Sequence, residues 1–235
     1  MREGLTFSAV WASLPEALEM TAAELTADTA LTAKMLSRFN KEYKRAYDLR
    51  TWEDAWEDGA LTPADLALVW SEVEDSRHFE LWSADPRAVT SAVECAYSTT
   101  RDGITLHYDY STVHGFWKPM VRPFTLTAYN AGTAYTLTNV VLASDGHNYV
   151  CIQAGTGQTP QSSPTYWRQQ PVLSILAEDV IDLAAGLKFI REGNYGTGNA
   201  LRQDAKASLD RAASQEFARL ARQNGRAWRP ATLPV

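Results

Sequence analysis

The sequence predicts an α+β protein that combines a helical bundle, an antiparallel β-sheet and a small all-β module. Three observations lead to this prediction. Apolar residues recur at helical spacing near both ends of the chain, and they alternate with polar residues within residues 65–124. Within residues 126–174 the only acid is Asp145 and the only base is Arg168. We therefore expect a neutral segment of separate character inside a highly charged chain.

The composition is that of a protein that is neither basic nor membrane-spanning. Over 235 residues the net charge is −6 and the isoelectric point is near 5.3. These values argue against a general nucleic-acid or membrane-surface binder, because such proteins need clustered Lys and Arg. No apolar run reaches about 18 residues, and the first residues lack the pattern of a signal peptide. We expect an intracellular product with no membrane partner, in which Cys95 and Cys151 are separate buried thiols.

Two helices are predicted near the start of the chain. The first covers residues 5–14, with Thr6 as its N-cap and Pro15 as its end. The second covers residues 28–50, with Asp28 as its N-cap. Its apolar face should consist of residues at every fourth position, namely Leu31, Met35, Phe39, Tyr43 and Tyr47.

The segment that follows the long helix combines tryptophans with acids. In residues 51–59 a helical turn would bring Trp52 and Trp56 to one face. The acids around them, Glu53, Asp54, Glu57 and Asp58, would then face outward. Two interpretations are open: a solvated helix face, or an acidic rim that faces a partner or repels DNA.

Residues 65–124 are predicted to form an antiparallel sheet with one covered face. Residues 104–110 alternate in polarity, and residues 78–86 end in a turn at Asp85-Pro86. Because of its two prolines, the segment 115–124 is expected to be an edge strand or an extended arm.

The neutral segment is predicted to contain a β-hairpin, followed by a polar loop over residues 155–165. Its strands cover residues 138–144 and 147–155. They are joined by Asp145-Gly146, a strong signal for a two-residue turn.

Two further helices are predicted at residues 174–193 and 199–225, with Asn199 as the N-cap of the second. The short connection makes them an antiparallel hairpin. The apolar face of the first is expected at Ile175, Val180, Leu183, Leu187 and Ile190, and that of the second at Leu201, Ala205, Leu209, Ala212 and Leu220.

The helices at the two ends of the chain would pack into a single core. On this interpretation residues 1–125 and 171–225 form one domain, and residues 126–170 are a module inserted into it. Residues 226–235 would be an extended arm.

Signatures of catalysis are missing from the sequence. It has no Gly-x-Ser-x-Gly, Walker A, His-Glu-x-x-His or Cys-x-x-Cys motif. The glycines at 193, 196 and 198 follow a predicted helix and not a strand, so a tight inter-helix turn is favoured over a phosphate loop. The histidines are too scattered for a zinc site: His78, His107, His114 and His147. We predict a protein that is not an enzyme and that has no cofactor and no metal.

Aromatic residues of the neutral module are the candidate binding residues: Tyr129, Tyr135, Tyr149, Tyr166 and Trp167. Exposed rings on a small β scaffold can stack on sugar rings. The alternative is that these rings form the module's own core, which a unit with few aliphatic residues needs.

Several segments together resemble the head-to-tail adaptor proteins of tailed bacteriophages. They are LTFSAVWASL (5–14), the long helix that ends in aromatics, FELWSADPRA (79–88), DGITL (102–106) and AGLKFIREGNYGTGNALRQDAKASLDRAASQEFARLARQ (185–223). The resemblance implies a homo-oligomeric ring, usually a dodecamer, that binds the portal protein and a tail-side neck or stopper protein. Genome DNA would pass through its lumen without sequence recognition.

Residues 126–170 resemble the carbohydrate-binding modules of chitinases. The pattern is carried by Tyr129, Tyr135, Val141, Gly146, Tyr149 and Trp167. The chain departs from it at Thr138-Asn139, where Gly-Asp is usual, and at Tyr166-Trp167, where two tryptophans are usual. The resemblance implies a glycan as a partner of the aromatic residues.

The leading hypothesis is therefore a structural protein of the virion neck, at the head-tail interface, assembled in the host cytoplasm. Acids such as Glu53, Asp54, Glu57 and Asp58 would line the lumen and repel phosphate. Trp228 and Arg229 would anchor the arm in a neighbouring subunit, or this segment is a disordered tail. The second hypothesis is a glycan-binding virion or surface protein that acts through residues 126–170.

Overall fold

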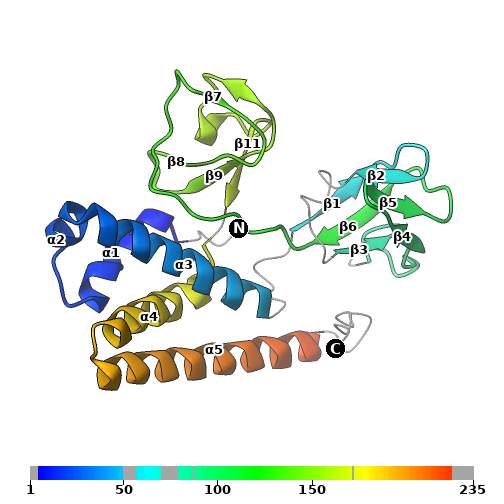
Figure 1. The fold of residues 1–235 in the computed structure, drawn as a ribbon. Helices are drawn as coiled ribbons and strands as arrows, with labels where there is room; N and C mark the ends of the chain where they lie inside the picture. The colour runs from blue at the N-terminus through cyan, green and yellow to red at the C-terminus, as the bar shows by residue number, and fades with distance from the viewer. Residues whose placement is uncertain (1–4, 50–56, 70–78, 87, 171, 224–235) are drawn as a thin grey trace. The chain divides into compact units, whose positions relative to one another are not determined.

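The computed structural model describes residues 5–49, 57–69, 79–86, 88–170 and 172–223. Over these residues the chain forms five α-helices and four small antiparallel sheets, which confirms the predicted α+β class (Figure 1). It divides into two compact units: Glu53–Met120 is one, and Met1–Trp52 with Val121–Val235 is the other. Each is described by itself.

Helix α1 (Phe7–Ala17) begins as predicted and ends later. The Ala9 N–H donates to the Thr6 hydroxyl at 3.0 Å, so Thr6 is the N-cap. Pro15 does not end the helix. A proline removes only one N–H from the ladder, and the Leu18 N–H still donates to the Leu14 carbonyl at 3.1 Å.

Helix α2 (Ala22–Ala27) was not predicted, although its capping box is legible in the sequence. The Thr21 N–H donates to the Glu24 carboxylate at 2.7 Å, and the Glu24 N–H donates to the Thr21 hydroxyl at 3.2 Å. Asp28 then caps α3 (Thr29–Leu49) as predicted, accepting from the Leu31 N–H at 2.8 Å.

The predicted apolar stripe of α3 is largely confirmed. Met35, Phe39, Tyr43 and Tyr47 are buried, while Leu31 is half-buried. Phe124 packs among these rings, with its centroid 5.0 Å from that of Tyr43 and 5.0 Å from that of Phe7 on α1. The Tyr43 hydroxyl accepts a hydrogen bond from the Leu173 N–H at 3.0 Å, and burial raises the pKa of this tyrosine. The start and the end of the chain therefore share one core.

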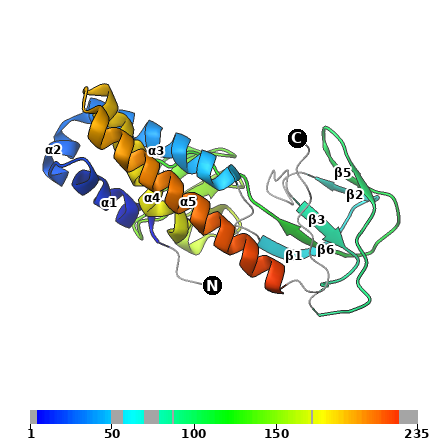
Figure 2. The same ribbon diagram turned by 90° about the horizontal axis from the view of Figure 1, so that it is seen from below.

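Helix α4 (Ser174–Arg191) lies in the middle of the helical stack, with α1 and α3 on one side and α5 (Tyr195–Gln223) on the other (Figures 1 and 2). A helix with neighbours on two sides buries more than one face. The predicted single face was for this reason too narrow: Ile175 is 40 % exposed, whereas Leu176 and Ala177 are buried.

Helix α5 begins four residues earlier than predicted. Asn194, and not Asn199, stands before its first turn, where its side chain accepts from the Thr197 N–H at 3.3 Å. Gly193 lies just beyond the end of α4. Its backbone is in the left-handed region, with φ of 86°, as expected at this position.

Two glycines let the backbones of α4 and α5 meet. A Cβ atom on Gly198 would lie 2.6 Å from the Gly186 carbonyl oxygen, and a Cβ on Gly186 would lie 2.8 Å from the Gly198 carbonyl oxygen. No other residue fits at either position without moving a helix. The hairpin depends on this contact.

The smaller unit consists of two three-stranded antiparallel sheets. The first has the order β1-β6-β3 and the second the order β2-β5-β4. The strands are β1 (Glu57–Leu61), β2 (Ala67–Val69), β3 (Phe79–Trp82), β4 (Tyr97–Thr99), β5 (Gly103–Leu106) and β6 (Val113–Trp117). Leu68, Leu81, Ile104 and Leu106 are central members of its apolar core.

Three predictions for this unit are corrected. Residues 115–117 belong to β6, which is the central strand of its sheet and not an edge, because both prolines come after its last residue. The strand predicted at 104–110 stops at Leu106, and Tyr108 is 65 % exposed. Glu57 and Asp58 lie on strand β1 and not on a helical turn; the rest of that turn, residues 51–56, lies outside the described residues.

The predicted hairpin of the neutral module is confirmed. Its turn has three residues and not the predicted two: the Ala143 N–H donates to the His147 carbonyl at 2.9 Å around Ser144, Asp145 and Gly146. Gly146, the last of the three, has φ of 83°. The strands are shorter than predicted: β9 (Asn148–Cys151) is the central strand, paired with β8 (Val140–Leu142) on one side and β11 (Trp167–Gln170) on the other. In a second, two-stranded sheet β7 (Ala134–Tyr135) pairs with β10 (Gly155–Thr156). A 3-10 turn at Pro160–Ser162 lies in the polar loop.

Three amide side chains hold the extended backbone of residues 122–125. The Gln170 side chain accepts from the Arg122 N–H at 2.9 Å and donates to its carbonyl at 2.8 Å. Asn40 on α3 does the same at Phe124, at 2.7 and 2.9 Å. The Asn148 side chain accepts from the Thr125 N–H at 2.7 Å. We call this arrangement the amide clamp; it joins the module's sheet to helix α3.

The module also contacts the first helix through its hairpin turn. The Ser8 N–H of α1 donates to the Gly146 carbonyl at 3.0 Å, and a Cβ on Gly146 would lie 3.1 Å from that of Ser8. Residues 126–170 thus group with the helices, whereas residues 53–120 form a unit of their own. The domain limits of 1–125, 126–170 and 171–225 were drawn from composition and stay a prediction.

Substitution of Gly198 by alanine should destabilise the chain by about 1–3 kcal/mol, because the new Cβ collides with the backbone of α4. Gly196→Ala is the matched control. Nothing lies within 4 Å of a Cβ there, and alanine favours the helix. Urea unfolding followed by circular dichroism measures both. Equal effects at the two positions would contradict the backbone contact.

Candidate functional site

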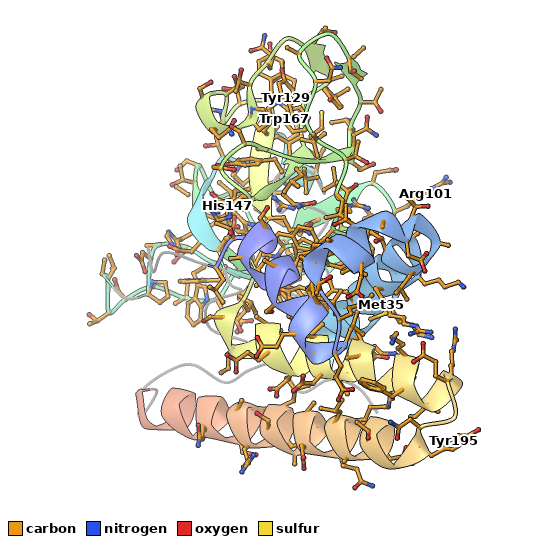
Figure 3. All side chains as sticks on the ribbon, turned by 90° about the vertical axis from the view of Figure 1, so that its left-hand side faces the viewer. Met35, Arg101, Tyr129, His147, Trp167 and Tyr195 are labelled. Carbon is orange, nitrogen blue, oxygen red and sulfur yellow. The ribbon has the colours of Figure 1, made fainter. Side chains whose placement is uncertain are left out.

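The aromatic residues of the module form a compact cluster. Trp167 is 3 % exposed and Tyr149 is 7 % exposed, and both pack against aliphatic residues of the sheet. Tyr129 and Tyr135 stand edge-on to the Trp167 ring, at centroid distances of 5.9 and 5.1 Å. Figure 3 shows Tyr129 and Trp167 together within the module. The five predicted site residues include the module's own core.

Hydrogen bonds within the module fix several of these rings. The Trp167 indole N–H donates to the Gln158 carbonyl at 2.7 Å. The Tyr149 hydroxyl donates to the Asp145 carboxylate at 2.8 Å, and burial together with this carboxylate raises the pKa of Tyr149 to about 12. The Tyr135 hydroxyl accepts from the Asn130 N–H at 2.8 Å.

Buried rings cannot stack on a ligand, so the predicted glycan face must use other members of the set. Tyr129, Tyr135 and Tyr166 are each half-buried and keep part of their rings at the surface. Glycan binding by these three tyrosines stays a prediction.

The predicted lumen acids are only partly described. Glu53 and Asp54 lie outside the described residues, as do Trp228 and Arg229 of the predicted arm. Glu57 and Asp58 are adjacent on β1, so their side chains point to opposite faces of the sheet. The Asp58 carboxylate lies 3.1 Å from the His114 Nε2 atom on β6.

A group of basic side chains, which we call the basic patch, combines one face of α3 with the end of α4, where Arg38 and Arg191 lie close together. Its members are Lys34, Arg38, Lys41 and Arg191. The three on α3 are spaced for one helix face. Partial burial lowers the pKa of Arg38, and repulsion from the nearby Arg191 guanidinium lowers it further. Glu192 raises the pKa of Arg38 and so offsets part of this shift. Arg38 also donates to the sulfur of Met35, labelled in Figure 3, at 3.5 Å.

The other cations of these helices are neutralised locally. Lys44 pairs with Asp48, Arg45 with Glu42, and Lys188 with Glu192. Within the described part of the chain, none of the four basic-patch residues forms such an ion pair. The basic patch therefore keeps most of its charge toward solvent.

A group of acidic side chains, which we call the acidic patch, lies along the seam between α4 and α5. It consists of Glu178, Asp179, Asp182 and Asp204. Burial raises the pKa of Asp182, and repulsion from Glu178 and Asp204 adds to the shift. Burial also raises the pKa of Asp179, although Ser208 and Arg211 partly stabilise its charge.

Three observations on the described residues concern the requirements of a metal site, a reactive thiol and a membrane span. No group of three or more His, Cys, Asp or Glu side chains there could hold a metal ion. Cys95 and Cys151 are free and buried, and burial raises the pKa of both thiols, which suits structural and not reactive cysteines. None of the described helices has the length and apolarity needed to cross a bilayer.

The chain matches no protein-family model and no curated protein. The function must therefore be inferred from its own residues. The basic and acidic patches were not predicted as sites, although the cations of α3 can be seen in the sequence. Their separation into two seams depends on which helices flank α4, and the pattern of one helix does not carry that information.

Replacing Asp182 by asparagine should stabilise the protein at neutral pH. A carboxyl group whose pKa is raised by folding weakens the folded state once the pH is above that pKa, and it stops doing so when it is protonated. The gain should be below about 1 kcal/mol, because the site is partly solvated. It should disappear below pH 3.8, the ordinary pKa of aspartate.

Melting temperatures at neutral and at acidic pH measure this difference. Asp210→Asn, at an exposed position on α5, is the control. A gain that persists in acid would show that charge repulsion is not its source.

Proposed function

We propose that this protein is a structural component of the neck of a tailed bacteriophage. It would be a head-to-tail adaptor that forms a homo-oligomeric ring, in the expected case a dodecamer, beneath the portal protein. A tail-side neck or stopper protein would bind the other end of the ring, and genome DNA would cross the lumen without sequence recognition. The protein would act in the virion, after assembly in the host cytoplasm, and not as an enzyme.

The observation that carries this proposal is the packing of helices from the two ends of the chain. Most of the residues that carry the resemblance to adaptors lie in these segments: α1 and α3 near the start, and the α4–α5 hairpin near the end. Tyr43 and Leu173 join them by a buried hydrogen bond, and Leu5 bridges to Val172. Long-range contacts of this kind join the two ends of the chain in one packed unit, which suits a subunit of a ring.

The smaller unit and the module are compatible with the same proposal. Both consist of short antiparallel strands with their own apolar cores. In the described residues, neither core contains a cluster that could hold a metal ion.

The decisive experiment is electron microscopy of the purified full chain, alone and mixed with the portal protein encoded by the same genome. We expect closed rings in at least one of the two conditions, with a single copy number near twelve. Native mass spectrometry of the same samples gives the stoichiometry independently. A monomer or dimer that does not bind the portal ring would overturn the proposal.

A second candidate function is glycan binding by the module. Its support is the partial exposure of Tyr129, Tyr135 and Tyr166 around the buried Trp167. Tyrosine rings at a surface can stack on the apolar faces of sugars. The helices would then serve as an oligomerisation platform that multiplies weak contacts.

Binding of the full chain to insoluble chitin and to a panel of soluble polysaccharides tests this candidate. Tyr166→Ala should abolish binding and leave the fold intact, while Ile152→Ala, at an exposed aliphatic residue of the module, should not. Trp167→Ala should cost about 3–5 kcal/mol of stability, so its loss of binding would not identify a sugar contact. Absence of binding across the panel would exclude a glycan function for these tyrosines.

A further inference from the structure

The two charged patches of the helical unit carry opposite charge in equal number. The basic patch has four cationic side chains and the acidic patch has four carboxyl groups. The basic patch combines α3 with α4, and the acidic patch combines α4 with α5. Like charges repel one another within each patch: Arg191 adds to the effect of burial in lowering the pKa of Arg38, and Glu178 and Asp204 add to it in raising the pKa of Asp182. Glu192 offsets the charge of the basic patch only in part, as Arg211 does for the acidic patch. A surface that concentrates like charge in this way is suited to one of opposite charge.

The patches are far enough apart to be occupied at the same time. Asp182 and Arg191 are nine residues apart on α4, which corresponds to about 14 Å along the helix. They also face different neighbours, α5 for the acidic patch and α3 for the basic patch. One copy can therefore present one patch to each of two other molecules.

We propose that copies of this chain associate head to tail, with the basic patch of one copy against the acidic patch of the next. This inference rests on the proposed ring and names the surfaces that would build it. Contact between two different patches is heterologous, so it generates a closed ring when the rotation between copies is suitable. A two-fold dimer whose axis passes through either patch would bring like charges together and is disfavoured.

A second copy fits the basic patch better than nucleic acid does. The chain has a net charge of −6, and the acidic patch lies on the same helix as Arg191. A duplex on the basic patch would meet this repulsion and would leave the acidic patch without a partner. Association of copies satisfies both patches with the same contact.

The experiment uses charge reversal at exposed members of each patch, in the full chain. The base-reversed variant carries Lys34→Glu and Lys41→Glu, and the acid-reversed variant carries Glu178→Lys and Asp204→Lys. Lys44→Glu is the matched control on α3, because Lys44 is not a member of the basic patch and pairs with Asp48. Asp210→Lys is the matched control on α5, on another side of that helix from Asp204.

Sedimentation velocity over a range of protein concentration measures self-association, and circular dichroism verifies that each variant is folded. We expect each reversed variant to associate roughly tenfold more weakly than the natural chain or worse, because like charges then face each other. Both controls should stay within about twofold. An equimolar mixture of the two reversed variants should recover association, as should one chain that carries all four reversals.

The possible results separate this inference from the proposed function. If the natural chain forms rings and both reversed variants do so equally well, the patches are not the interface and the inference fails, while the adaptor proposal stands. If the natural chain stays monomeric both alone and with portal protein, both fail. If the base-reversed variant associates normally but loses binding to double-stranded DNA, the basic patch is a nucleic-acid surface and the inference is overturned.

Discussion

The amide clamp is the constraint on which the arrangement of the larger unit depends. Residues 122–125 have no strand partner, so their backbone groups would be left without hydrogen bonds when they are covered by the helices and the module. Gln170, Asn40 and Asn148 replace that partner with side chains from β11, α3 and β9. Because Gln170 and Asn148 are buried, removal of either would leave polar backbone atoms without partners inside the protein. Phe124, placed by Asn40, then fills the space between α1 and α3.

The helical stack follows from two kinds of close contact. Rings from α1, α3 and residue 124 fill one side of α4, and the two facing glycines allow α5 to approach the other side. The large rings fill the space between helices, and the glycines let two helix backbones come close. Both produce dense packing. The result places α4 between two seams, and this position turns ordinary surface charges into two separate patches.

The module and the patches suggest different relations to partners. In the module, aromatic residues that could face a ligand are largely used for its own core, and only the tyrosines at its margin remain partly exposed. In the helical unit, charge that is not neutralised locally remains at the surface on both seams. A protein that joins copies of itself through its helices and carries a β module as an accessory would account for both observations.

The sequence by itself determined the elements that depend on near neighbours. The N-caps Thr6 and Asp28, the place of the hairpin around Asp145-Gly146 and the apolar stripe of α3 were predicted correctly, although the hairpin turn has three residues and not two. The capping box of α2 is also legible in the sequence. Tertiary structure alone decided the pairing of Asn40 with Phe124, the central place of β6, the burial of Trp167 and the two charged seams. These depend on contacts between residues far apart in the chain, and local periodicity does not specify which distant surface a residue will meet.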